Sequence, residues 1–155
     1  MVRSREVLYG QSFMDRLSER YEQPANQVAS LRMIKESLRR DLEAALNTRR
    51  HMGTALDGYE HASSSVLNYG MEDLTNIRTS PDGYLLQMQR AIQNCLAEYE
   101  PRLTSVTVTV SDLAETSSRE VRLQIAAHMQ LIPGTETIFF NTVFDVASET
   151  YSVGQ

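Results

Sequence analysis

The stretch YLLQMQRAIQNCLAEYEPRLTSVTVTV, from Tyr84 to Val110, decides the fold because its apolar period changes at Pro101. Before the proline, apolar side chains recur every three or four residues, which places them on one side of a helix. Pro101 ends that helix, since its ring removes a backbone donor and disfavours helical angles in the preceding residue. From Val106 to Val110, valines then alternate with threonines, as expected of a strand with one buried face. The stretch therefore predicts a helix that leads directly into a sheet. The predicted helical stripe consists of Leu85, Met88, Ile92, Cys95, Leu96 and Tyr99.

A second helix is predicted from Gln27 to Asn47, where apolar residues recur at the helical period and Asn26 and Asn47 are placed to cap the two ends. Two further strands are predicted from alternating apolar residues, from Val121 to Met129 and from Thr137 to Val146. The predicted fold class is therefore α+β, with two main helices packed on the apolar face of a three-stranded antiparallel sheet.

The segments outside these elements are less regular. Residues 1–26 bury too little to form a stable helix alone, so they are expected to be either a frayed, disordered terminus or an arm that docks on a partner through Phe13 and Leu17. Residues 27–155 are expected to form a single domain. Within the long connection between the helices, Asn68-Tyr69-Gly70 predicts a tight turn in which Gly70 takes positive φ.

The composition argues against several classes of protein. With 155 residues and 41% hydrophobic residues, the chain suits one domain with a real core. A net charge of -5 at pH 7 argues against a nucleic-acid-binding surface, which needs a basic field. No apolar run is long enough for a membrane span, and the first residues lack the apolar centre of a secretory signal, so a cytoplasmic protein is expected. The single cysteine, Cys95, is expected to pack as a small hydrophobe.

The sequence contains few of the residue patterns that catalysis needs. The three histidines share no ligand spacing and the phosphate-binding glycine motifs are missing from the sequence, so no metal, cofactor or small-molecule substrate is expected. The best paired carboxylates, Glu98 and Glu100, lie close to Arg102, which would lower the pKa of a neighbouring acid. A general acid needs a raised pKa, so no enzymatic activity is predicted.

Two groups of charged residues are candidate partner-binding sites. The Gln27–Asn47 helix and the residues after it carry six basic side chains against three acidic ones, which fits either a solvated face with local ion pairs or a basic face that binds a protein. The candidates in this group are Arg39, Arg40, Arg49 and Arg50. The second group is Glu100, Pro101 and Arg102, at the corner between helix and strand, where an ion pair would either fix the corner or contact another protein.

Three motifs, in order along the chain, resemble a known family. They are SLRRDLEAALNTRR (Ser37–Arg50), SSVLNYGMEDL (Ser64–Leu74) and YEPRLTSVTV (Tyr99–Val108). With the strand-rich C-terminal half, they resemble the baseplate wedge proteins of bacterial type VI secretion systems, the TssE family, which is related to the wedge or sheath-initiator proteins of contractile phage tails. The resemblance extends from about Phe13 to Val146, and it departs from the family at Met71-Glu72, where a leucine and a proline are usual.

The resemblance implies a wedge-like structural subunit without catalysis, in the cytoplasm at the baseplate attached to the inner membrane. Its expected partners are other baseplate wedge subunits and sheath proteins, whose polymerisation it would initiate. Glu100, Pro101 and Arg102 match the family's Glu-Pro-Arg motif, which is thought to meet sheath subunits. We expect the first or the third strand to extend a sheath sheet by strand addition. The alternatives are a peptidoglycan hydrolase, since such families have been labelled "lysozyme-like", and a generic protein-binding adaptor.

Overall fold

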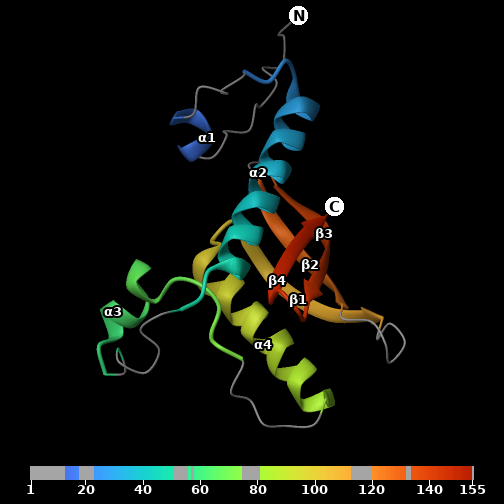
Figure 1. Ribbon diagram of the computed structural model, residues 1–155. Helices are drawn as coiled ribbons and strands as arrows, with labels where there is room; N and C mark the ends of the chain where they lie inside the picture. The colour runs from blue at the N-terminus through green and yellow to red at the C-terminus, as the bar shows by residue number, and fades with distance from the viewer. Residues whose placement is uncertain are drawn as a thin grey trace, which may run out of the picture.

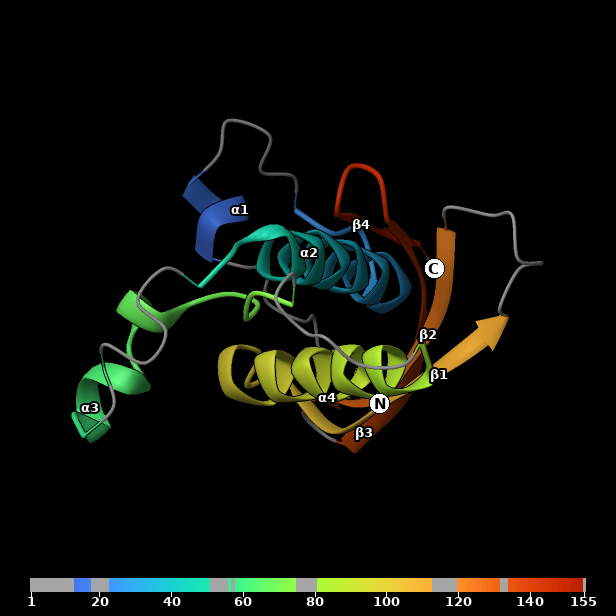
Figure 2. The same cartoon turned by 60° about the horizontal axis from the view of Figure 1, so that its bottom comes forward.

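The molecule has two layers, with two long helices side by side on one face of an antiparallel sheet (Figures 1 and 2). The computed structural model describes residues 13–17, 23–50, 56, 58–74, 81–112, 120–131 and 134–154. The predicted α+β class is confirmed. The predicted number of strands is wrong, because the sheet has four strands and not three.

The helices and strands follow one another with simple connectivity. The helices are α1 (Phe13–Leu17), α2 (Gln27–Asn47), α3 (Glu60–Ser63) and α4 (Pro81–Tyr99), with a 3-10 helix η2 (Val66–Asn68) after α3. The strands are β1 (Leu103–Asp112), β2 (Glu120–Leu131), β3 (Gly134–Asp145) and β4 (Thr150–Gly154). They pair in the order β1-β2-β3-β4, each antiparallel to the next. No helix in the described part of the chain combines the length and hydropathy needed to cross a bilayer.

Helix α2 has the predicted bounds, and its first turn is capped as predicted. The Asn26 side chain accepts a hydrogen bond from the Ala29 backbone N–H at 2.9 Å. The prediction for the other end is only partly right. Asn47 does donate to the Glu43 carbonyl of the last turn, at 2.9 Å, but the same side chain also reaches β4.

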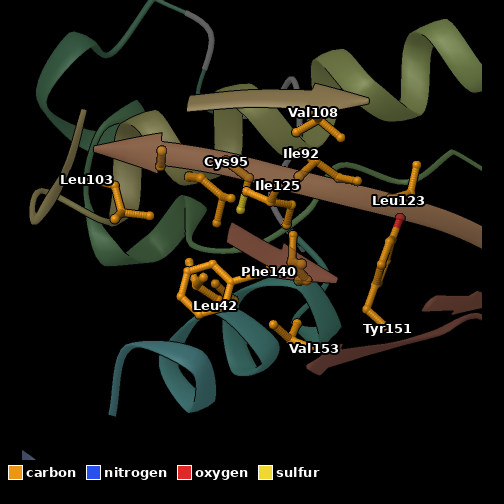
Figure 3. Packing of buried hydrophobic residues seen from close by; sticks show 14 of the residues in the cluster. Leu42, Ile92, Cys95, Leu103, Val108, Leu123, Ile125, Phe140, Tyr151 and Val153 are labelled. Carbon is orange, nitrogen blue, oxygen red and sulfur yellow. The ribbon is translucent and has the colours of Figure 1, made fainter. Parts of the chain in front are cut away.

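The core lies between the helices and the sheet (Figure 3). Leu42 of α2, Ile92 of α4, and Ile125 and Phe140 of the sheet are each at most 1% exposed. Cys95 is also buried, and burial raises the pKa of its thiol to about 11. The predicted role of Cys95 as a small hydrophobe is therefore confirmed.

Strand β4, which was not predicted, pairs with the second half of β3. The sequence TYSVG is short and contributes only Tyr151 and Val153 to the core, so its alternation is too brief to stand out. The Tyr151 ring packs on Phe144, with ring centroids 4.6 Å apart. β4 pairs with β3 from Asn141 to Asp145, so this part of β3 has a neighbour on both sides. The expectation that the third strand extends a partner's sheet is therefore limited to residues 134–140, where it stays a prediction.

The connection between α2 and α4 is fastened to the end of α2. Gly70 has φ +111, as predicted, and a Cβ atom at this position would lie 2.3 Å from the Thr48 carbonyl oxygen. Such an approach is possible only because glycine has no side chain. Next to it, Met71 N–H donates to Thr48 O and Arg50 N–H donates to Met71 O, each at 2.7 Å. Helix α3 lies further out, away from the sheet (Figures 1 and 2).

Candidate partner-binding site

The corner between α4 and β1 is built around Glu100 and Arg102. Arg102 Nε donates to Glu100 Oε1 at 2.7 Å, and Nη2 donates to Glu100 Oε2 at 2.5 Å. The Arg102 backbone N–H also donates to Oε1, at 3.1 Å. Nη2 makes a further bond to Asp41 Oδ2 on α2, at 2.6 Å. The predicted ion pair therefore exists, and Asp41 ties it to the second helix.

The two members of this pair differ in exposure. Glu100 is 7% exposed, whereas the Arg102 side chain is 28% exposed and Pro101 lies at the surface. The hydrogen bonds that Arg102 donates to Glu100 raise the pKa of Arg102 above its ordinary value, so the guanidinium stays charged. Glu100 thus acts by holding Arg102, and a partner that approaches the corner meets Pro101 and Arg102.

A hollow of about 340 Å³ lies beside the corner, between α2 and the last turn of α4. The rings of Tyr69 and Tyr99 line it and meet edge to face, with centroids 5.1 Å apart. The Tyr99 hydroxyl donates to the Asn68 carbonyl at 2.6 Å, and burial raises the pKa of Tyr99 to about 12. Asp41 and Arg102 complete the rim. A side chain that entered this hollow would meet aromatic edges and the carboxylates of Asp41 and Glu100 beside the Arg102 guanidinium.

Five of the six basic residues of α2 and of the segment after it are paired within the chain. Arg39 contacts Glu36 at 2.9 Å and Glu43 at 3.0 Å. The other pairs are Lys35 with Glu136 at 2.6 Å, Arg40 with Asp15 at 2.8 Å, Arg49 with Asp73 at 3.6 Å and with Glu149, and Arg50 with Glu98 at 3.6 Å. These contacts agree with the alternative of a face with ion pairs, although several reach across the fold. Partner binding by Arg40, Arg49 and Arg50 stays a prediction.

The proposed docking arm is partly described. Phe13 and Leu17 both lie in α1, and Leu17 is 66% exposed. The side chain of Phe13 lies outside the described part of the chain. Asp15 joins α1 to α2 through its ion pair with Arg40. Docking through this arm, and the boundary between residues 26 and 27, remain predictions.

The carboxylates considered for catalysis each face an arginine. Glu98 lies 3.6 Å from Arg50, and Glu100 is bonded to Arg102. Both carboxylates are therefore engaged in ion pairs within the chain. Among the described residues, no group of three or more His, Cys, Asp or Glu side chains could hold a metal ion.

The two outer strands of the sheet, β1 and β4, differ in their contacts with the helices. Among the described residues, β1 receives one hydrogen bond from a helix, in which Gln89 Nε2 donates to the Val108 carbonyl at 3.3 Å. Strand β4 is contacted by Arg39, Glu43 and Asn47 of α2. The sequence carried no signal for these contacts, since the partners are more than 100 residues apart along the chain.

Comparisons with known proteins gave a family match and a structural match. Residues 32–133 match the family model described as baseplate wedge protein gp25. Among solved structures, a chain of "The baseplate complex from the type VI secretion system" is similar, with a TM-score of 0.47 and 20% sequence identity. The match covers 72% of this chain and 94% of that chain. No curated protein matches the sequence. The residues matched by the family model include the corner and the hollow beside it.

Proposed function

The chain belongs to the baseplate wedge protein gp25 family, and on that basis we propose that it is a structural, non-catalytic baseplate subunit of a type VI secretion machine. It joins the other wedge subunits and initiates the polymerisation of sheath proteins. Its place is the cytoplasm, at the baseplate attached to the inner membrane. The observation that carries the proposal is the family match, which spans most of α2 and all of α4, β1 and β2. The three sequence motifs that resemble the TssE family favour the type VI machine.

Strand β1 is the margin at which we propose that a sheath strand adds. Among the strands that the structure describes, β1 pairs with β2 alone. The Val108 carbonyl accepts its bond from α4, so Val108 directs its backbone away from β2. In an antiparallel strand, the backbone N–H and C=O groups of successive residues point to opposite sides. Those of Val110 therefore point away from β2, like those of Val108. A strand added here would gain backbone hydrogen bonds, while side chains would set its register.

The corner residues support this choice of margin. A bulge separates Thr104 from Thr107, with Ser105 at φ 52, so regular pairing in β1 begins after the bulge. Pro101 and Arg102 come just before this end of β1. A strand that adds to β1 would therefore pass the partly exposed guanidinium of Arg102, which we propose fixes its angle of approach.

A proline at Val110 tests strand addition. Val110→Pro removes an N–H that points away from β2, a position where edge strands tolerate proline. Val110→Ala is the matched control, because it loses the same side chain but keeps the N–H. Tagged full-length protein is expressed in cells that contain the machine, and the captured partners are identified. Circular dichroism first establishes that both variants are folded.

The proposal expects the wild type and Val110→Ala to capture baseplate and sheath proteins, and Val110→Pro to capture baseplate proteins only. Sheath capture by a folded Val110→Pro variant would reject strand addition at β1. Failure of the wild type to capture any baseplate or sheath protein would reject the proposed function and favour the generic adaptor.

A further inference from the structure

The margin of β4 that faces away from β3 is occupied by side chains of α2. Asn47 Nδ2 donates to the Tyr151 carbonyl at 2.8 Å, and Tyr151 N–H donates to Asn47 Oδ1 at 2.8 Å. Two residues further on, Val153 N–H donates to Glu43 Oε2 at 3.1 Å, and the Val153 carbonyl accepts from Arg39 Nη1 at 2.9 Å. Both backbone groups of both residues are therefore bonded to the helix.

The match between helix and strand has a geometric cause. Residues four apart in a helix are separated by about 6 Å along its axis. Residues two apart in a strand are separated by about 6.8 Å. Asn47 and Glu43 are four residues apart, so they keep step with Tyr151 and Val153, which are two apart in β4. Arg39 lies four residues further along α2, and its long side chain reaches back to the Val153 carbonyl. A side-chain amide has the same donor and acceptor as a peptide group, so Asn47 can take the place of a residue in a fifth strand.

The three side chains are also held to one another. Arg39 Nη1 donates to Glu43 Oε2 at 3.0 Å, and Asn47 Nδ2 donates to the Glu43 carbonyl at 2.9 Å. Beneath them, the side chains of Tyr151 and Val153 are 6% and 4% exposed. The bonding groups thus keep their positions without a partner, which lowers the entropy cost of holding the margin closed.

We propose that Arg39, Glu43 and Asn47 form an edge lock, which closes β4 to strand addition, while β1 is the acceptor margin of the sheet. An uncovered edge strand is a template for pairing with another chain. With β4 locked, a strand of a sheath subunit cannot add beyond it. The proposal that a sheath strand adds to β1 rests on the proposed function. The closure of β4 does not depend on that function. This role assigns Arg39 to a contact within the chain, in place of the partner contact expected from the sequence.

Amide hydrogen exchange on the full-length protein tests the lock. Asn47→Ala exposes both backbone groups of Tyr151, and Glu43→Ala exposes the N–H of Val153. The Ser152 amide lies between them and points toward β3, so it is an internal reference. Arg40→Ala is the matched control, because Arg40 lies on the same helix but pairs with Asp15. Exchange is followed residue by residue by NMR spectroscopy.

The lock predicts that exchange at Tyr151 rises by roughly tenfold or more in Asn47→Ala, and likewise at Val153 in Glu43→Ala, while Ser152 is unchanged. Arg40→Ala should alter none of the three. Unchanged exchange at Tyr151 and Val153 would overturn the proposal. So would an equal rise at Ser152, because the side chains would then hold the strand in place and not close its margin.

A second measurement uses another copy of the chain as the added strand. Sedimentation equilibrium should show stronger self-association of the Glu43→Ala/Asn47→Ala double variant than of Arg40→Ala, because the second margin is open. Equal association would reject the lock. Neither result depends on the capture of sheath proteins, so the lock and the proposed function can fail separately.

Discussion

Arg102 covers the carboxylate of Glu100, with two guanidinium nitrogens 2.7 Å and 2.5 Å from its two oxygens. The glutamate is 7% exposed, so the guanidinium takes the place of water around its carboxylate. The ion pair at the start of the proposed acceptor strand therefore stabilises the fold itself. Any contact with a partner is made through Arg102, whose position is already fixed by Glu100.

Arg102→Ala should lower the free energy of unfolding by about 3 kcal/mol, because it leaves a buried carboxylate without its cation. Removing both charges, in Glu100→Gln/Arg102→Ala, should recover part of that loss. Urea titrations measure both effects. Arg122→Ala is the control, since the Arg122 side chain is 60% exposed and lies 4.0 Å from Glu120. Equal stability of Arg102→Ala and the wild type would show that water replaces the guanidinium.

Gly70→Ala should destabilise the protein by about 3 kcal/mol, because the new Cβ would lie 2.3 Å from the Thr48 carbonyl oxygen at a φ of +111. Gly58→Ala provides a matched comparison. Gly58 also has positive φ, +90, but a Cβ there would have nothing within 4 Å. Its cost should be about 1 kcal/mol, from the left-handed backbone alone. Equal urea midpoints for the two variants would contradict the close approach.

The stability of the fold should fall as the pH rises above 9. Burial raises the pKa of the Cys95 thiol from 9.0 to about 11, so between these values the unfolded chain loses a proton that the folded chain keeps. The unfolded state then binds fewer protons, and the free energy of unfolding declines by roughly 1 kcal/mol per pH unit from this group. Urea titrations from pH 7 to the alkaline range measure the slope. Cys95→Ala should show a shallower decline, and an unchanged slope would show that the thiol does not contribute.

The purified protein should not clear a suspension of peptidoglycan, because Glu98 and Glu100 are each paired with an arginine. A fall in turbidity reports clearing, with a known muramidase as the positive control. Clearing that is lost in both Glu98→Gln and Glu100→Gln would establish catalysis and reject the structural assignment.

Much of the fold could be predicted from short-range patterns. The period of α2, the helix stop at Pro101 and the alternation of Val106 to Val110 each depend on neighbours within a few residues. The same holds for the cap at Asn26 and the positive φ of Gly70. Backbone angles and side-chain spacing act locally, so a single sequence is enough to recognise them.

Contacts between distant segments could not be predicted in this way. Asn47 and Tyr151 are 104 residues apart, and Arg102 and Asp41 are 61 apart. Strand β4 was missed because five residues carry little periodic signal, although pairing with β3 and α2 stabilises them.

The sequence by itself determined where this chain is helical, where it is extended and which faces are apolar, because those properties depend on residues close together along the chain. The tertiary structure alone decided which sheet margin is closed and which charges are buried. Hydrogen bonds and ion pairs between remote residues form only after packing has brought them together, and they leave no period in the sequence.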